Sequence, residues 1–296
     1  MYLYVPLNIL NHTSMVLIFV LLDHAKLSSF TLNLIPFLQD KNGVADVKLA
    51  LTLWEQFLLC MVRLRRGVDT EQLADMFGVS SSTVSRIFNT WVNLLAQELP
   101  AYLFCWPTKE QIKQTLPQIF KSFPKTRAII DCTEFYIQRP SMPSSQRKTW
   151  SSYKQHNTYK LLVACTPNGY ISFESNLWTG NASDRKITFN SGFLDYVEPY
   201  GDIMADRGFC IRDALALMNA TFNIPPFTNK KCLSSHAVTK IRRIARARIH
   251  VECCIGRLKC FKILSGLIPL SLKKELLDII IVFCASLCNM DKKLVN

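Results

Sequence analysis

The sequence predicts an α/β domain with a mixed sheet flanked by helices, preceded by an all-helical domain. Helical periodicity with recognisable caps fills residues 30–100, whereas short apolar strand patterns alternate with helices over residues 127–296. A connector punctuated by prolines, residues 101–126, lies between them. Of the 296 residues, 49% are hydrophobic and 11% aromatic, which is enough to bury a core in both parts.

The helical part contains a predicted helix-turn-helix. In "DTEQLADMFGVSSSTVSRIFNTW", Asp69 or Thr70 is placed to cap a helix that ends at Phe77. Gly78 is a typical turn residue, and Ser80 is placed to cap the second helix. An ordinary helical hairpin is the alternative interpretation. In the helix-turn-helix interpretation a set of polar residues at the start of the second helix faces a major groove: Ser81, Ser82, Thr83, Ser85 and Arg86.

Net charge points to a polyanionic partner. The formal charge of +13 and the pI near 9.3 favour nucleic acid or an anionic membrane surface, without choosing between them. The eleven cysteines are odd in number and include no CxxC pair, which is typical of reduced thiols in an intracellular protein. The pair Cys232 and His236 has no second half to complete a zinc site.

Two apolar stretches could be taken for membrane-spanning segments, but the sequence does not favour this interpretation. Residues 1–29 form an apolar segment that matches no expected element. Its apolar run is interrupted by Asn8, Asn11 and His12, and it has neither a basic start nor a cleavage site of small residues. The later run "IIIVFCASLC" is too short to span a bilayer and predicts a buried helix. We therefore expect no membrane partner.

An aspartate follows the apolar run in each of two predicted strands. Asp131 follows "AII" and Asp206 follows "IMA", and the predicted order of elements allows the first strand to lie beside the fourth. Side by side, the two carboxylates would repel and raise one pKa, whereas a divalent cation would stabilise both. Hard oxygen ligands suit Mg²⁺ or Mn²⁺.

A third carboxylate lies on a long basic helix predicted over residues 235–261. Glu252 is the only acidic residue between positions 240 and 262, and helical spacing places Arg248 and Lys259 on its face. The alternative is an Arg248–Glu252 ion pair within the helix, stabilising by about 0.2–0.5 kcal/mol. Gly256 is expected to let this face approach the sheet closely.

Several other polar residues have open roles. Lys154 and Lys160, near Tyr153 and His156, are interpreted equally well as phosphate contacts or as a solvated face. Strand alternation places Glu134 on the face opposite to Asp131, for a surface or supporting role. Ser183 and Asp184 are typical of a helix cap rather than of a metal site. A positive track along the basic helix is expected from Lys240, Arg242, Arg243, Arg246 and Lys259.

Six stretches in order resemble one known family. They are "IIDCTEFYIQRP", "YKQHNTYKLLVACTPNGYISF", "WTGNASDRKI", "IMADRGF", "NIPPF" and "RIHVECCIGRLKCFKILSG". With "FGVSSSTVSRI" upstream, they resemble the PIF/Harbinger-like DDE superfamily endonucleases of eukaryotes over roughly residues 30–290. The resemblance implies an RNase H-like fold with Asp131, Asp206 and Glu252 as the DDE triad.

The resemblance also implies a function. The triad would hold Mg²⁺ or Mn²⁺, two ions per site, in a transposase-type endonuclease that cuts and joins DNA in the nucleus. The nucleic-acid contacts expected beside the triad are Lys154, Lys160, Arg248 and Lys259. A domesticated, catalytically silent DNA-binding protein is the alternative. Assembly as a homodimer, or with a separate DNA-binding partner, stays open.

Overall fold

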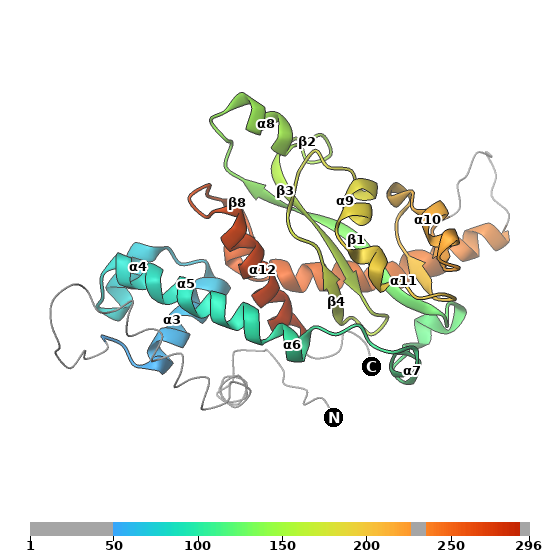
Figure 1. The fold of residues 1–296 in the computed structure, drawn as a ribbon, viewed down its shortest axis with the longest axis horizontal. Helices are drawn as coiled ribbons and strands as arrows, with labels where there is room; N and C mark the ends of the chain where they lie inside the picture. The colour runs from blue at the N-terminus through green and yellow to red at the C-terminus, as the bar shows by residue number, and fades with distance from the viewer. Residues whose placement is uncertain (1–49, 226–234, 291–296) are drawn as a thin grey trace.

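A computed structural model of the chain describes residues 50–225 and 235–290 (Figure 1). The expected N-terminal apolar segment and the helical periodicity before residue 50 lie outside the described residues. The described chain begins with the helices α3 (Leu53–Arg66), α4 (Thr70–Phe77) and α5 (Ser81–Glu98). Three short elements then lead to the sheet: α6 (Pro100–Leu103), α7 (Lys109–Gln114) and η1 (Gln118–Ser122).

The caps predicted for the helix-turn-helix are confirmed. Asp69 is the N-cap of α4, and its side chain accepts a hydrogen bond from the Gln72 amide at 2.8 Å. Gly78 ends that helix in the left-handed conformation, with φ of 64°, where a residue with a Cβ would be strained. Ser80 caps α5 by accepting from the Thr83 amide at 3.2 Å. Local chemistry therefore fixes the turn between α4 and α5.

The sheet is built around one long central strand. Strand β1 (Thr126–Ile137) pairs antiparallel with β3 (His156–Cys165) and parallel with β6 (Asp202–Met204). Beyond them, β4 (Ile171–Glu174) pairs antiparallel with β3, and β7 (Thr221–Asn223) pairs parallel with β6. Three short strands complete the sheet: β2 (Trp150–Ser151), β5 (Trp178–Thr179) and β8 (Leu267–Ile268).

This strand order is the RNase H-like arrangement that the sequence predicts. An antiparallel group, β4, β3 and β1, continues into two parallel strands, β6 and β7. The predicted hairpin turn at positions 167–169 joins β3 to β4, with Gly169 at a φ of 86°. The fold class, a mixed sheet with helices behind an all-helical domain, is confirmed.

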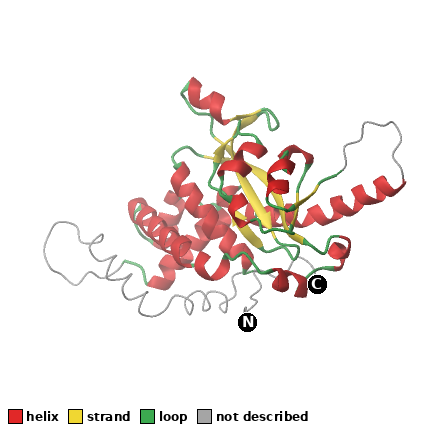
Figure 2. Cartoon of the chain, turned by 45° about the vertical axis from the view of Figure 1, so that its right-hand side comes forward, coloured by secondary structure: helices red, strands yellow, loops and turns green. Residues whose placement is uncertain are grey.

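Helices cover both faces of the sheet (Figures 1 and 2). On one face lie α9 (Asp184–Asn190), η2 (Phe193–Tyr196), η3 (Arg207–Phe209) and α10 (Arg212–Leu217). On the other lie α11 (Ser235–Lys259), η4 (Lys262–Leu264) and α12 (Lys274–Asn289). Alternation along β1 divides its side chains accordingly: Ala128 and Ile130 join the first core, Ile129 and Phe135 the second.

The helical part and the sheet share a single core. Helix α12 packs on α5, and Trp91 of α5 belongs to the same buried cluster as Ile280 and Phe283 of α12. Asn289, at the end of α12, donates to the carbonyls of Leu103 and Ile171 and accepts from the Ile171 amide, each at 2.8 Å. The run "IIIVFCASLC" lies within α12, as the predicted buried helix. None of the described helices is both long and apolar enough to cross a membrane.

Candidate active site

The parallel pairing of β1 with β6 brings Asp131 and Asp206 to neighbouring strands. Ile129 is opposite Met204 in the last pair between β1 and β6, so each aspartate lies two residues beyond this pair. Asp131 accepts a hydrogen bond from the Cys132 amide, and Asp206 caps η3 by accepting from the Arg207 amide, both at 2.8 Å. The two aspartates that the sequence analysis selected therefore follow the last pair between two neighbouring parallel strands.

Asp131 lies within its strand, although the apolar run before it stops there. Strand β1 continues to Ile137 because β3 keeps pairing with it as far as Tyr136 opposite Thr158. Alternation along β1 places Asp131 on the α11 face, between the core residues Ile129 and Phe135. The residues before and after Asp131 are therefore both paired with β3, which limits the movement of the Asp131 backbone.

Burial dominates the electrostatics of Asp131. It raises the pKa of this carboxyl to about 6, from an ordinary value of 3.8, and the charges of Asp184 and Asp206 act in the same direction. Arg248 and the hydrogen bond from the Cys132 amide oppose the shift. Burial therefore disfavours the charged form of Asp131, and a bound cation would stabilise that form.

This shift predicts a pH-dependent stability. Because the folded state holds the Asp131 proton more tightly than the unfolded state, stability falls as the pH rises from about 4 to about 6 and does not recover above. We expect Asp131→Asn to raise the melting temperature at pH 8 more than at pH 4. Mg²⁺ should raise the melting temperature of the unaltered chain at pH 8 and leave that of the variant unchanged, which thermal denaturation with and without Mg²⁺ would measure. Equal gains at both pH values would contradict this account.

Arg248 of α11 reaches across to the sheet instead of pairing within its helix. Its Nη1 lies 3.4 Å from Oδ1 of Asp206, with 16% of the arginine side chain and 54% of the aspartate side chain exposed. The alternative Arg248–Glu252 pair is therefore not the one that forms. In this arrangement Arg248 is not free to bind a DNA phosphate, because it forms an ion pair with Asp206.

Glu252 lies on the correct face of α11 without joining the aspartates. Arg248, four residues before it, contacts Asp206, and Lys259, seven residues after it, donates to the Glu134 carbonyl at 3.0 Å. Glu252 itself is exposed. Within residues 50–225 and 235–290, no three His, Cys, Asp or Glu side chains are grouped so that they could hold a metal ion.

The space beside Glu252 is open. A Cβ added to Gly256 would meet no atom within 4 Å, so the expectation that this glycine permits close packing on the sheet is wrong. Asp131 and Asp206 supply hard carboxylate oxygens, which fit Mg²⁺ or Mn²⁺. Glu252 would complete the set only by turning its exposed side chain towards them.

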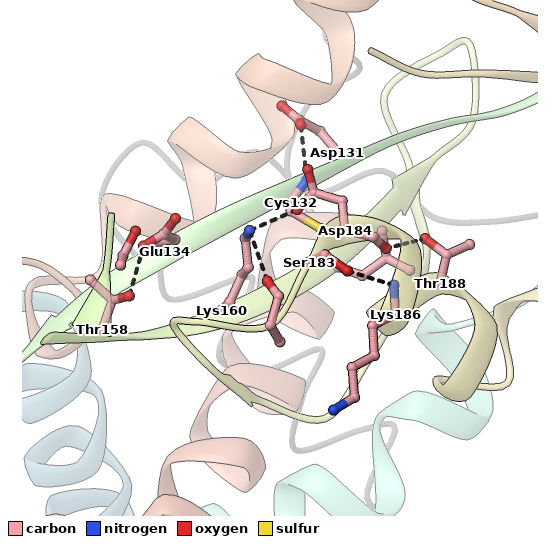
Figure 3. Close-up of polar contacts among 12 residues, drawn as sticks. Asp131, Cys132, Glu134, Thr158, Lys160, Ser183, Asp184, Lys186 and Thr188 are labelled. Carbon is pink, nitrogen blue, oxygen red and sulfur yellow. Dashed lines mark hydrogen bonds and ion pairs between the residues drawn. The ribbon is translucent and has the colours of Figure 1, made fainter. Parts of the chain in front are cut away.

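Lys160 and Asp184 belong to a second polar cluster, next to β1 (Figure 3). The Lys160 ammonium lies 2.7 Å from Oδ1 of Asp184 and donates to the Ala182 carbonyl at 3.3 Å. Only 15% of the Lys160 side chain is exposed, so the expectation that it contacts DNA phosphate does not fit its position. No pattern in the sequence predicted this pair, because a helix cap already accounted for "SDRK". That cap is confirmed, since Ser183 accepts from the Lys186 amide at 3.2 Å.

Asp184 is a carboxylate whose contribution to the site the sequence did not reveal. A Cβ added to Gly208 would lie 3.3 Å from its Oδ2, so the glycine after Asp206 leaves room for Asp184. Asp184 raises the pKa of Asp131 and, together with burial, that of the Cys132 thiol. Glu134 is buried rather than at the surface, and accepts a hydrogen bond from Thr158 Oγ1 at 2.7 Å (Figure 3).

Comparison with known proteins identifies the family of the chain. The family model described as "DDE superfamily endonuclease" matches residues 130–289, more than half of the chain, and "Helix-turn-helix of DDE superfamily endonuclease" matches residues 49–101. The chain belongs to the DDE superfamily endonucleases. The matched region contains Asp131, Asp206 and Glu252.

Similar individual proteins are more distant. "Protein ALP1-like" from Arabidopsis thaliana is 26% identical over 149 residues, which cover 50% of this chain and 36% of the relative. This DDE superfamily member thus spans about a third of that relative's length. A pre-cleavage Mos1 transpososome structure shares 12% identity, covering 74% of this chain and 81% of that one, with a TM-score of 0.22. A Mos1 paired-end complex with the left transposon end shares 14%, covering 77% and 83%, with a TM-score of 0.23. Overlaps this loose support no inference about the site.

The helix-turn-helix of this DDE superfamily member presents polar groups at the start of α5. Ser81, Ser82 and Arg86 are exposed, whereas Thr83 and Ser85 are half-buried. The Ser80 hydroxyl lies 2.9 Å from those of Ser82 and Thr83, so part of this polar set serves the helix cap. Arg86 supplies the positive charge of the set.

Arg86→Ala should weaken the binding of duplex DNA at every sequence, if Arg86 contacts a phosphate. The slope of log affinity against log salt should then fall by about one. Fluorescence anisotropy over a salt series would measure both quantities. Arg212→Ala, which removes an exposed arginine of α10, is the matched control and should change neither. An unaltered slope for Arg86→Ala would exclude the phosphate contact.

The other cations expected to bind DNA differ in exposure. Lys154 is exposed, with its ammonium 4.6 Å from the Tyr153 ring. Lys259 is partly buried; burial and the nearby charge of Lys154 lower its pKa, which Glu134 and Asp131 partly restore. Along α11 of this DDE superfamily member, Arg242, Arg243 and Arg246 are exposed, as a positive track requires. The side chain of Lys240 lies outside the described residues.

Proposed function

We propose that this chain is a transposase-type DNA endonuclease that cuts and joins DNA strands with two divalent cations. The observation that carries the proposal is the parallel pairing of β1 and β6, which sets Asp131 beside Asp206 under α11. Family membership and the intact triad support it. When bound, the cations activate the attacking oxygen and stabilise the leaving oxygen at phosphorus.

The protein residues have separable roles in this proposal. Asp131 is fixed by its strand, and Asp206 by the start of η3, so both hold their oxygens in place before DNA arrives. Glu252 would close the site from α11. Arg248, released from Asp206 when that carboxylate binds metal, would become available to a DNA phosphate.

A second function is favoured by one specific observation. Arg248 already neutralises Asp206, and Glu252 is not gathered with the aspartates. A domesticated protein that keeps the fold and binds DNA through its helix-turn-helix, without cutting, would be compatible with this arrangement. In either case we propose DNA as the partner and the nucleus as the location, with a homodimer or a separate DNA-binding partner as further possibilities.

Nicking of supercoiled plasmid separates the two functions. The endonuclease proposal expects open-circular product with Mg²⁺ or Mn²⁺, none with EDTA, and none from Asp206→Ala with either ion. DNA binding without metal-dependent nicking would favour the silent protein. Nicking that survives Asp206→Ala would contradict the role proposed for Asp206.

A further inference from the structure

Three large aromatic side chains are exposed at the end of the sheet that carries α8 (Pro143–Thr149) and β2. Figure 1 shows where α8 and β2 lie. The exposed fractions are 39% for Tyr136, 42% for Trp150 and 83% for Tyr153. Tyr136 packs edge-on against the His156 ring, with centroids 5.2 Å apart, on one face of the sheet, whereas Trp150, paired with Asn157, lies on the other face. Exposed large aromatic side chains that lie close together are a feature of interaction surfaces. We call Trp150 and Tyr153, which lie three residues apart at the hairpin between β2 and β3, the aromatic tip.

The backbone under the aromatic tip is firmly held. Asn157, buried opposite Trp150, donates to the Gln146 carbonyl and to the Thr149 hydroxyl, both at 2.9 Å. The Lys154 amide donates to the Ser151 hydroxyl at 3.2 Å, which closes the turn between β2 and β3. The rings are therefore presented by an ordered hairpin, so little conformational freedom remains to be lost when a ligand stacks on them.

Basic side chains lie close to these rings along the chain. Lys154 lies over the Tyr153 ring, and Arg147 and Lys148 are exposed at the end of α8. Lys259 of α11 donates to the carbonyl of Glu134, three residues along β1 from Asp131, at 3.0 Å, and burial and the charge of Lys154 lower its pKa. Positive charge therefore lies both beside the aromatic tip and along β1.

We propose that the aromatic tip binds single-stranded DNA next to the position of cutting. This inference rests on the proposed function in taking DNA as the substrate, and it names the unpaired strand as a second ligand of the same enzyme. Aromatic rings interleaved with lysines are the chemistry that binds unpaired bases, whose faces are free to stack while their phosphates contact the cations. In duplex DNA those faces are covered by neighbouring bases, so the aromatic tip prefers unpaired strands.

Binding measurements without divalent metal test this inference independently of cleavage. Fluorescence anisotropy would compare labelled oligo(dT) with a labelled blunt duplex, using the full chain in EDTA. Trp150→Ala and Tyr153→Ala should each weaken oligo(dT) binding roughly 5- to 150-fold, the loss of one stacked base, and change duplex binding little. Trp150→Phe and Tyr153→Phe should retain most of the affinity.

Two further variants complete the design. Tyr200→Ala removes an aromatic that is 74% exposed outside the aromatic tip, and should leave both affinities unchanged. Lys154→Ala should lower the salt slope for oligo(dT), whereas Trp150→Ala should not. Equal losses for oligo(dT) and duplex, or no loss from the aromatic variants, would overturn the inference and leave the aromatic tip as a protein-binding surface. A chain that never nicks plasmid but shows the expected pattern here would refute the endonuclease proposal alone.

Discussion

Asp206→Asn should abolish metal-dependent strand cleavage while DNA binding persists. Removing a residue that only hydrogen-bonds to a metal ligand lowers metal affinity or activity about 10- to 100-fold. Removing a ligand itself should therefore lower activity by more than about a hundredfold. The substitution keeps the shape of the side chain and its capacity to accept from the Arg207 amide, so η3 should remain intact. Removing a negative charge beside the phosphate path should leave DNA affinity unchanged or increased.

The matched control for this experiment is Asp202→Asn. Asp202 lies in the same strand, β6, and accepts a hydrogen bond from the Asn223 amide group at 3.1 Å, away from the proposed site. Plasmid nicking and anisotropy would be measured on both variants. Full cleavage by Asp206→Asn, or an equal loss in both variants, would show that Asp206 is not a ligand on which the chemistry depends.

Trp91→Ala should lower the free energy of unfolding of the whole chain by about 3–5 kcal/mol. Trp91 is fully buried, meets Phe57 with ring centroids 5.5 Å apart and donates to the Gln56 side chain at 3.4 Å. Its cluster extends from α3 and α5 through α12 to the sheet. The loss should therefore be felt in one cooperative transition and not only in the helix-turn-helix.

Urea unfolding followed by far-UV circular dichroism measures this effect. Trp150→Ala removes the same side chain from an exposed position and should cost less than about 1 kcal/mol. Trp91→Phe should lie between the two. A biphasic curve in which Trp91→Ala shifts only the first phase would mean that the helical part and the sheet unfold separately.

The sequence predicted the local structure well because its signals are local. Caps such as Asp69 and Ser80, and the turn at Gly169, act through neighbouring residues and need no tertiary context. The pairing of β1 with β6 was accessible as well, since a short apolar run before Asp131 matches the one before Asp206 and the predicted order of elements allows the two strands to be neighbours.

The long-range polar contacts were not predictable in the same way. An arginine four residues before a glutamate in a helix suggests an ion pair within the helix. Arg248 of α11 instead pairs with the carboxylate of Asp206, which follows β6. Lys160 looks like a solvated charge until Asp184, 24 residues later, is seen to bind it. Glu134 looked exposed because strand alternation identifies opposite faces but does not reveal that both are covered.

The most direct test of the central claim is a crystal structure of the chain soaked in Mn²⁺, with the anomalous signal recorded. The account predicts Mn²⁺ bound by the carboxylates of Asp131 and Asp206, Glu252 turned towards them, and Arg248 displaced from Asp206. A structure in which Arg248 still pairs with Asp206, and no anomalous peak lies beside Asp131, would contradict it.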